Sequence, residues 1–301
     1  MKLDKTIKLG IIGLSEGNGH PYSWSAICNG YDPKLMNKCP FEVIPKYLQK
    51  REFPKDQIKF ARVTHIWTQS KEVSEMVSKT CYIEKVVNKY EDMIGNVDGI
   101  LLARDDAINH LKMSKPFLDA GLPIYIDKPL ATSYLEGKKI LDLQKYPAQV
   151  FTCSALRYAK EFNKKLDDLD LGKILKIDAR ISKDWEKYSI HIIEPLISLI
   201  PHRGRLEEYS FSKKGNISTL KLSYEKIKNI NISTLGSIKI EPQIKIIGEK
   251  RSLNLIFKDT FFAFKYALNQ FIKTVKYKEI LINQDSILEI ISLIEIGMRN
   301  D

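Results

Sequence analysis

The 301-residue sequence predicts an α/β domain built on a parallel sheet, followed by an α+β domain whose sheet is mostly antiparallel. Three observations support this fold class. A compact apolar run ending in glycine, IKLGIIG at 7–13, is typical of a buried parallel strand. Short apolar runs then alternate with helical patterns as far as about residue 130, which favours right-handed crossovers. After residue 206 the chain alternates polar and apolar residues, as antiparallel strands do.

In the first domain, expected at 1–130, strands and helices take turns. The expected strands are 7–13, 61–67, a weak one at 83–87, 97–103 and 122–126. The expected helices are 22–29, a short one near Tyr47, 71–79 and 107–119. Segment 31–55 holds four prolines and should otherwise be irregular.

In the second domain, expected at 131–301, a helix from about Leu130 leads out of the parallel sheet. The remaining elements are a strand at 173–182, an apolar helix at 190–200, several strands within 206–257, and helices at 261–275 and 285–298. Two domains suit a chain of this length.

Composition excludes several classes of protein. Apolar residues make up 44% of the chain, as in ordinary globular proteins. The sequence has no run of about 18 uncharged apolar residues, so we expect no membrane span. The apolar part of the first fourteen residues is too short for a convincing signal peptide, and we expect a cytoplasmic protein. The four cysteines (28, 39, 81 and 153) are far apart, which predicts buried thiols and no metal site.

The net charge of +11 raises the possibility of a nucleic-acid partner. The excess comes from scattered lysines, arginine is scarce, and no motif combines aromatic and basic residues. We therefore expect no nucleic-acid partner, and keep a basic RNA- or DNA-associated protein as a minor alternative.

In open parallel sheets, ligands bind beyond the carboxyl ends of the strands. The segments that follow the expected strands are 13–21, 67–71, 103–106 and 127–129. We expect the functional residues of the first domain in these four segments.

The first of these segments is a glycine turn between a strand and a helix. A fingerprint of the form G-x-G-x-x-G lets a pyrophosphate approach the start of a helix. With Gly13 in first place, the chain offers Ser15 and Asn18 at the next two positions, while Gly17 and Gly19 are out of register. This degraded fingerprint predicts a Rossmann-type dinucleotide-binding domain; the alternative is a tight turn without a ligand. The predicted cofactor contacts in this turn are Gly13, Ser15, Asn18 and His20.

The second segment lacks the acid that usually binds the ribose hydroxyls. Thr68, Gln69 and Ser70 could bind a ribose or a 2′-phosphate, and Lys71 could pair with the phosphate. The choice between NAD and NADP therefore stays open. The alternative is that Ser70 simply caps a helix.

Residues 97–133 carry the most specific pattern. A strand is followed by a helix with His110, an alanine–glycine turn at 120–121 and a strand ending in Asp127-Lys128-Pro129. This order resembles the glucose–fructose oxidoreductase and inositol dehydrogenase family (Gfo/Idh/MocA), in which the last strand ends in Glu-Lys-Pro. The resemblance continues at 156–158 and loosely in the last two helices.

The resemblance implies that Lys128 lies near the nicotinamide and binds the reacting oxygen. A lysine at a strand end can stabilise developing alkoxide charge or exchange a proton. The further predicted cofactor contacts are Ala103, Arg104, His110 and Asp127. The family usually has a small residue followed by proline where this chain has Arg104-Asp105-Asp106, which puts charge beside the cofactor.

The family's second signature is Asp-x-x-x-His on a helix of the second domain. Its nearest match is Lys187 followed by His191, with Glu194 three residues on. We predict His191 as a second acid/base residue, since its ordinary pKa is near neutrality; the alternative is a core histidine. The predicted substrate contacts are Arg157, Trp185, Tyr188 and Glu194.

These residues predict an NAD(P)-dependent oxidoreductase that transfers hydride to or from a sugar-like or polyol substrate, without a metal. Its site is expected in the cleft between the domains. The other hypothesis is a non-catalytic nucleotide- or sugar-binding protein on the same fold. The expected partners are a small-molecule substrate and a second copy of the chain, as a homo-oligomer (dimer or tetramer).

Overall fold

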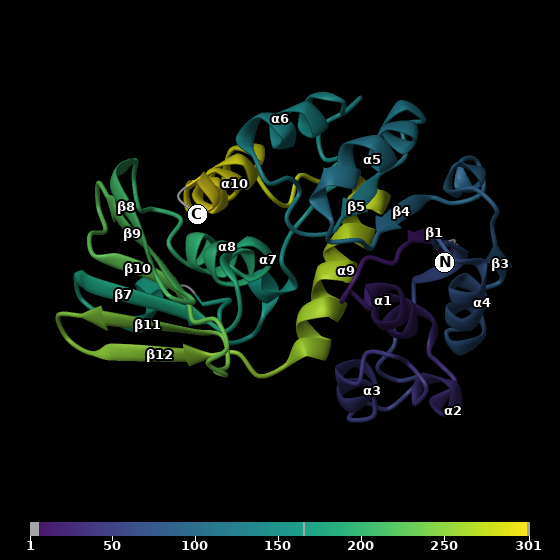
Figure 1. Cartoon of the computed structure of the whole chain (residues 1–301), viewed down its shortest axis with the longest axis horizontal. Helices are drawn as coiled ribbons and strands as arrows, with labels where there is room; N and C mark the ends of the chain where they lie inside the picture. Colours follow the sequence, from purple (N-terminus) through teal and green to yellow (C-terminus); the bar gives the residue numbers. More distant parts are fainter. Residues whose placement is uncertain (1–5, 165, 300–301) are drawn as a thin grey trace. The chain divides into compact units, whose positions relative to one another are not determined.

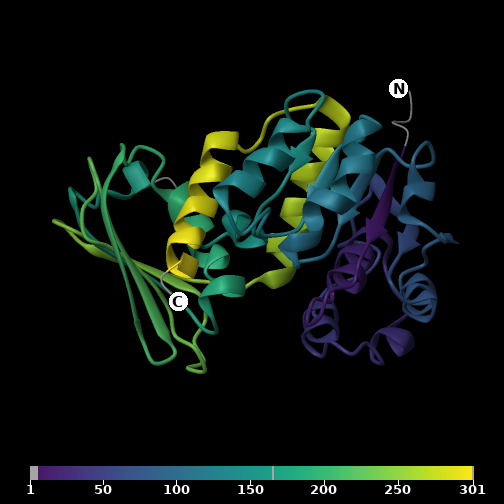
Figure 2. The same ribbon diagram turned by 45° about the horizontal axis from the view of Figure 1, so that its top comes forward.

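The structure is a computed structural model that describes residues 6–164 and 166–299. The chain forms two compact units (Figures 1 and 2). The first unit consists of Met1–Ala131, Leu135–Cys153 and Phe264–Asn283, and the second of Thr132–Tyr134, Ser154–Ala263 and Gln284–Asp301. Segment 264–283, from the expected second domain, thus returns to the first unit.

The first unit is built on a six-stranded parallel sheet of order β3-β2-β1-β4-β5-β6. Its strands are β1 (Ile7–Ile12), β2 (Ala61–Trp67), β3 (Lys85–Val86), β4 (Gly99–Leu102), β5 (Ile124–Ile126) and β6 (Val150–Phe151). This is the doubly wound order, whose direction reverses between β1 and β4. The predicted parallel sheet is confirmed, and β6 is a strand that the sequence analysis did not predict.

Helices cover both faces of this sheet. They are α1 (His20–Asn29), α2 (Pro33–Met36), α3 (Val43–Leu48), α4 (Lys71–Thr80), α5 (His110–Asp119), α6 (Tyr134–Asp142) and α9 (Thr260–Tyr277). Figure 1 shows α5 on one side of the sheet and α1 on the other. The stretch 31–55 holds two short helices where one was predicted.

Large aromatic side chains fill the core of the first unit. Trp24 of α1 stacks on Tyr125 of β5, with ring centres 4.8 Å apart, and both are fully buried. Tyr125 also packs beside Phe271 of α9. Gly99 in β4 allows the same helix to approach, because a Cβ there would lie 3.0 Å from Val275. Helix α9 therefore belongs to this core although it comes from the end of the chain.

The second unit has a mixed sheet of order β12-β11-β7-β10-β9-β8. Its strands are β7 (Ile174–Ile181), β8 (Leu206–Lys214), β9 (Ile217–Tyr224), β10 (Ile230–Thr234), β11 (Gln243–Gly248) and β12 (Ser252–Ile256). Only β7 and β10 pair in parallel, among the described residues. The predicted α+β class is confirmed.

Helices cover one face of this second sheet. They are α7 (Trp185–Tyr188), α8 (Ile190–Leu199) and α10 (Gln284–Arg299). Helix α8 packs against β7 and β11, and α10 packs beside α8 and bonds to β9, where the Tyr224 hydroxyl donates to Glu289 at 2.8 Å. Helix α8 is apolar nearly all round and is buried accordingly. The outer face of the sheet carries no helix from the described part of this unit.

No helix among the described residues is long and apolar enough to cross a membrane.

Candidate functional site

The carboxyl ends of the parallel strands bring together the segments named from the sequence. β1 lies between β2 and β4, and β5 follows β4. The Gly13 N–H bonds to the Trp67 carbonyl at 3.1 Å, and the Ala103 N–H bonds to the Ile12 carbonyl at 2.7 Å. The turn after β1 and the ends of β2, β4 and β5 therefore form one edge, where open α/β sheets bind ligands.

Gly13 is required by packing inside the protein. A Cβ at this position would lie 2.2 Å from Cγ of Pro21, in the first turn of α1. A Cβ at Gly19 would lie 2.5 Å from the Phe41 ring. Gly17, in contrast, has a φ of +76° and nothing within 4 Å of its Cβ position. Gly13 and Gly19 therefore let the turn close, and Gly17 lets it bend where space is open.

The turn has backbone donors available for an anion. The Leu14 N–H donates to Oε1 of Gln69 at 2.9 Å, and the Gln69 side-chain amide donates to the Leu14 carbonyl at 2.5 Å. Asn18 Oδ1 accepts the His20 N–H at 2.8 Å, and Pro21 has no backbone N–H. Within the described residues, the N–H groups of Glu16, Gly17 and Gly19 donate to no protein acceptor. Backbone donors beside the start of α1 suit a pyrophosphate, so the turn fits a dinucleotide.

Asp127, at the end of β5, is the centre of a buried polar network. Its Oδ2 accepts from the Asn18 amide at 2.8 Å and lies 2.5 Å from Nδ1 of His20. Its Oδ1 accepts the Lys128 N–H at 2.8 Å. Burial raises the pKa of Asp127, but the His20 ring and Lys128 outweigh it and hold that pKa below the ordinary value. Asp127 is therefore an anion that fixes the positions of its donors.

Lys128 lies beside this network and is only 6% exposed. Its Nζ is 3.6 Å from Oδ2 of Asp105, which follows β4. Ser15 of the glycine turn donates to the other oxygen of Asp105 at 2.5 Å and accepts the Asp105 N–H at 3.1 Å. A buried ammonium needs such a charged partner, and this one orients the lysine at the sheet edge.

Arg104 forms an ion pair with a residue of its own loop, Asp106. Its Nε donates to Asp106 at 2.8 Å and its second nitrogen pairs with the same carboxylate. Burial raises the pKa of Asp106, but the bonds from Arg104 and Asn109 hold it below its ordinary value. Arg104 is thus neutralised within the segment that was predicted to bring charge to the cofactor. Ala103 is buried and contributes backbone to the edge.

His110 has a structural position. The ring is 0% exposed, with Nδ1 3.0 Å from the Leu130 carbonyl and Nε2 2.8 Å from the Arg104 carbonyl. It ties the loop after β4 to the loop after β5. The prediction that His110 contacts the cofactor needs correction, because both ring nitrogens face backbone oxygens.

The residues after β2 are mostly engaged with each other. Thr68 is buried, and its hydroxyl donates to the Ser70 carbonyl at 2.6 Å. Ser70 caps α4, accepting the Val73 N–H at 3.3 Å, which is the alternative stated from the sequence. Gln69 and Lys71 are exposed beside them.

The second unit has its own polar cluster, formed by the start of α8 and the segment after β6. Nδ1 of His191 lies 2.8 Å from Oγ of Ser154. The Ser154 N–H donates to Glu194 at 2.6 Å, and Arg157 lies 3.5 Å from the same carboxylate. The structure thus brings together three residues named from the sequence, with Ser154 at the centre. No sequence motif marked Ser154, which precedes the family-like stretch by two positions.

Glu194 is 2% exposed. Burial raises its pKa from 4.5 to about 7, although Arg157 and the Ser154 N–H oppose this rise. It can therefore gain or lose a proton near neutral pH.

The other residues named from the sequence near His191 lie outside the hydrogen bonds of this cluster. Trp185 is 3% exposed, and its indole N–H donates to the Ile294 carbonyl at 3.0 Å. It packs in the core of the second unit, so its prediction as a pocket residue needs correction. Tyr188 lies beside His191, with ring centres 5.9 Å apart, and bonds to Lys183 through its hydroxyl. Lys187, at the family's aspartate position, is exposed on α7.

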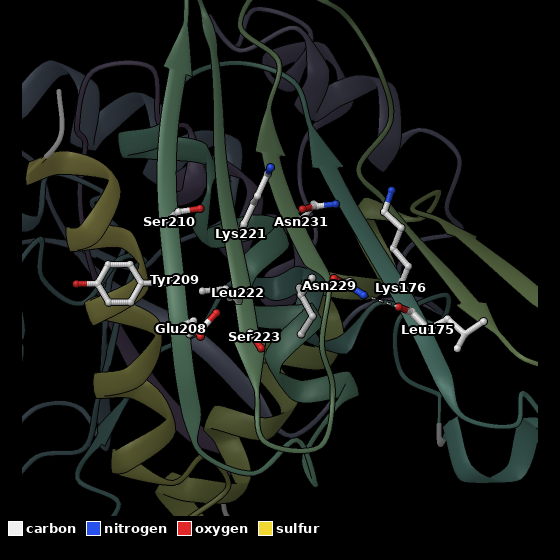
Figure 3. A pocket seen from close by; sticks show the side chains of 11 residues that line it. Leu175, Lys176, Glu208, Tyr209, Ser210, Lys221, Leu222, Ser223, Asn229 and Asn231 are labelled. Atoms are coloured by element: carbon white, nitrogen blue, oxygen red, sulfur yellow. Dashed lines mark hydrogen bonds between the residues drawn. The ribbon is translucent and has the colours of Figure 1, made fainter.

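Two hollows, one in each unit, contain none of these residues. One of about 670 Å³ lies over β7, β8, β9 and β10 and is lined by polar side chains such as Ser210, Lys221 and Asn231 (Figure 3). Another of about 810 Å³ lies at the opposite end of the parallel strands, beside Ile7 and Asp98. No group of three or more His, Cys, Asp or Glu side chains among the described residues could hold a metal ion.

Comparison with protein families finds a similarity in part of the first unit. Residues 44–153 match the model described as the oxidoreductase family with an NAD-binding Rossmann fold (GFO_IDH_MocA). This matched segment of the first unit is similar to the NAD-binding Rossmann domain of that family. The match contains the ends of β2, β4 and β5, including Asp127 and Lys128. A comparison with curated protein sequences gave no match.

Solved structures resemble the whole chain at low sequence identity. The myo-inositol dehydrogenase from Lactobacillus casei in complex with NAD(H) and myo-inositol has a TM-score of 0.74 and 15% identity, over 98% of this chain and 94% of that one. A myo-inositol dehydrogenase from Corynebacterium glutamicum has a TM-score of 0.71 and 13% identity, over 98% and 97%. A protein described as a putative myo-inositol dehydrogenase from Sinorhizobium meliloti has a TM-score of 0.71 and 14% identity, over 98% of this chain and 97% of that one. At these identities the likeness shows that the fold is shared.

Proposed function

We propose that this chain is an NAD(P)-dependent oxidoreductase that moves hydride between a nicotinamide and an oxygen-bearing carbon of a sugar-like or polyol molecule. The observation that carries the proposal is Lys128, a buried ammonium at the carboxyl end of β5, held beside Asp105 within the family-matched segment. Structures of this fold include a myo-inositol dehydrogenase with NAD(H) and myo-inositol, which supports this substrate class.

The residues of the first unit have separate tasks. The N–H groups of Glu16, Gly17 and Gly19 would bind the pyrophosphate, and Gln69 would hold the turn in shape. A bound nicotinamide supplies the hydride acceptor or donor. Lys128 would bind the substrate oxygen and stabilise the negative charge that develops there. Residues 67–71 contain no acid, which would let NADP bind beside NAD, although the Glu72 carboxylate accepts the Ser70 hydroxyl at 2.6 Å.

The second unit would provide substrate contacts. Arg157, His191 and Glu194 form one polar cluster around Ser154. Its carboxyl and imidazole groups suit a hydroxyl-rich molecule, because each hydroxyl can both donate and accept a hydrogen bond. We retain His191 as a second acid/base candidate.

A binding protein without turnover is the second candidate. It is favoured by Lys187, which replaces the aspartate of the family motif, and by the ion pair that already engages Lys128. Native mass spectrometry and NADH fluorescence titration test cofactor binding. Absorbance at 340 nm with NAD or NADP and a panel of inositols, hexoses and their acids tests turnover. Cofactor binding with no absorbance change on any member would favour the binding protein. Absence of cofactor binding would reject the oxidoreductase and a nucleotide-binding protein, and would leave a sugar-binding protein.

A further inference from the structure

The ring of His20, the first residue of α1, is held in one orientation by three neighbouring side chains. Nδ1 lies 2.5 Å from Oδ2 of Asp127. One ring face stacks on the indole of Trp24, with centres 4.8 Å apart and planes 16° from parallel. Phe264 contacts the ring edge-on at 5.0 Å. The side chain is still 18% exposed, so the ring is ordered but open to the outside.

The bond to Asp127 fixes which nitrogen carries a proton. An ionised carboxylate only accepts hydrogen bonds, so Nδ1 of His20 is the donor. The Asn18 amide and the Lys128 backbone N–H also donate to this carboxylate, and these bonds hold it in place. Nε2 is then the nitrogen available for proton exchange. A carboxylate that orients a histidine in this way is a recurrent device of acid/base catalysis.

We propose that His20 is the acid/base catalytic residue of this chain and that Asp127 is its positioning residue. The proposal rests on the oxidoreductase function proposed above. In the direction of alcohol oxidation, the C–H bond breaks and its hydride goes to the nicotinamide. The O–H bond breaks as well, its proton goes to Nε2 of His20, and the carbon–oxygen bond becomes double. In reduction, His20 returns the proton to the new hydroxyl.

The neighbouring candidates suit other tasks. Lys128 has its ammonium 3.6 Å from Asp105, which orients it to donate to the substrate oxygen. His191 has Ser154 at its Nδ1, and position 187 provides lysine instead of a carboxylate. His20 has a buried carboxylate, that of Asp127, at its Nδ1. The first unit alone therefore contains an oxyanion-binding group and an acid/base pair at one strand end.

Chemical labelling tests this inference without knowledge of the substrate. Diethyl pyrocarbonate acylates unprotonated imidazole nitrogens, and peptide mass spectrometry reads each of the five histidines separately. We expect His20 of the wild-type protein to react at Nε2. With NADH at about ten times its dissociation constant, the rate at His20 should fall about tenfold, as mass action requires. His202 is exposed and should react equally with and without NADH, while His110 is fully buried and should stay unmodified.

The outcomes separate the two proposals. If NADH fails to bind in a parallel fluorescence titration, the proposed function fails and the role of His20 fails with it. If NADH binds but His20 is unreactive, or reacts at the same rate with NADH, the inference is overturned and the oxidoreductase remains. Protection of His191 in place of His20 would likewise overturn it.

Variants then test the positioning role of Asp127. In ¹⁵N-histidine NMR, the wild-type protein should show His20 protonated at Nδ1, and Asp127→Asn should lose this tautomer preference. On any substrate found in the 340 nm panel, His20→Gln should lower kcat about 100- to 1,000-fold while the NADH dissociation constant changes less than about threefold. His202→Gln is the matched control and should keep the wild-type kcat. A kcat within about threefold of wild type for His20→Gln would refute the catalytic role.

Discussion

Glu194 makes the stability of the second unit depend on pH in a direction unusual for a carboxyl group. Burial raises its pKa from 4.5 to about 7 in the folded protein. Between these values the folded state holds the proton and the unfolded state does not, so folding stability falls as pH rises. Below pH 4.5 both states are protonated and the carboxyl group has no such effect.

The magnitude follows from the pKa change. One pKa unit corresponds to about 1.4 kcal/mol, so the buried charge costs about 3 kcal/mol above pH 7. Some of this cost is already present at pH 5, and about 2 to 3 kcal/mol develops between pH 5 and pH 8. Replacing Glu194 by glutamine removes the charge and retains an acceptor for the Ser154 N–H.

Urea unfolding at pH 5 and pH 8, followed by circular dichroism, measures this effect. The pKa of about 7 already contains the attraction of Arg157, so the ion pair adds no separate contribution to this difference. Relative to wild type, the variant should therefore gain about 2 to 3 kcal/mol on going from pH 5 to pH 8. Glu186→Gln on the exposed face of α7 is the matched control and should follow the wild type. Equal pH dependence of Glu194→Gln and wild type would refute the reasoning.

Three further predictions concern the parallel sheet edge. Lys128→Met should lower kcat about 100- to 1,000-fold in the 340 nm assay with NADH affinity nearly unchanged, because it removes a preorganised donor; a similar loss of affinity would assign Lys128 to cofactor binding alone. Gly13→Ala should destabilise the first unit by about 1 to 3 kcal/mol in urea unfolding, since its Cβ would lie 2.2 Å from the Pro21 ring; an unchanged midpoint would contradict this packing. NADH and NADPH should bind within about tenfold, or 1.4 kcal/mol, of each other in fluorescence titrations, and Lys71→Glu should weaken NADPH more than NADH; a stronger preference for NADH in the wild type would reject the idea.

The sequence predicted the long elements well, because periodicity is a local property. The apolar run at 7–13 and the alternation after residue 206 correspond to β1 and to strands β8–β12. β6 has only two residues and α7 only four, too few for any period to be recognised. The single helix predicted near Tyr47 is accompanied by α2, which starts at Pro33 with Asp32 as its cap.

The site was only partly predictable for a different reason. Asp127 and Lys128 could be named because they form a compact motif. Their partners are remote in sequence: Asn18 is 109 positions from Asp127, and Ser15 is 90 from Asp105. Strand order sets these pairs, and local patterns do not contain it. His110 was placed at the cofactor for the same reason, since its two carbonyl partners could not be seen in the sequence.

The aspartate at position 127 has a consequence for how related chains should vary. The resemblance pairs it with the glutamate of Glu-Lys-Pro, whose side chain is longer by one methylene group. The 2.5 Å contact with His20 and the 2.8 Å contact with Asn18 fit the length of an aspartate side chain, and one more methylene group would displace the carboxylate from both. Relatives with glutamate at this position should therefore lack the histidine at the start of α1, and relatives with aspartate should keep it. Positions 18, 20 and 127 should thus change together among relatives, and they would distinguish a subgroup of chains whose histidine and carboxylate come from the same domain.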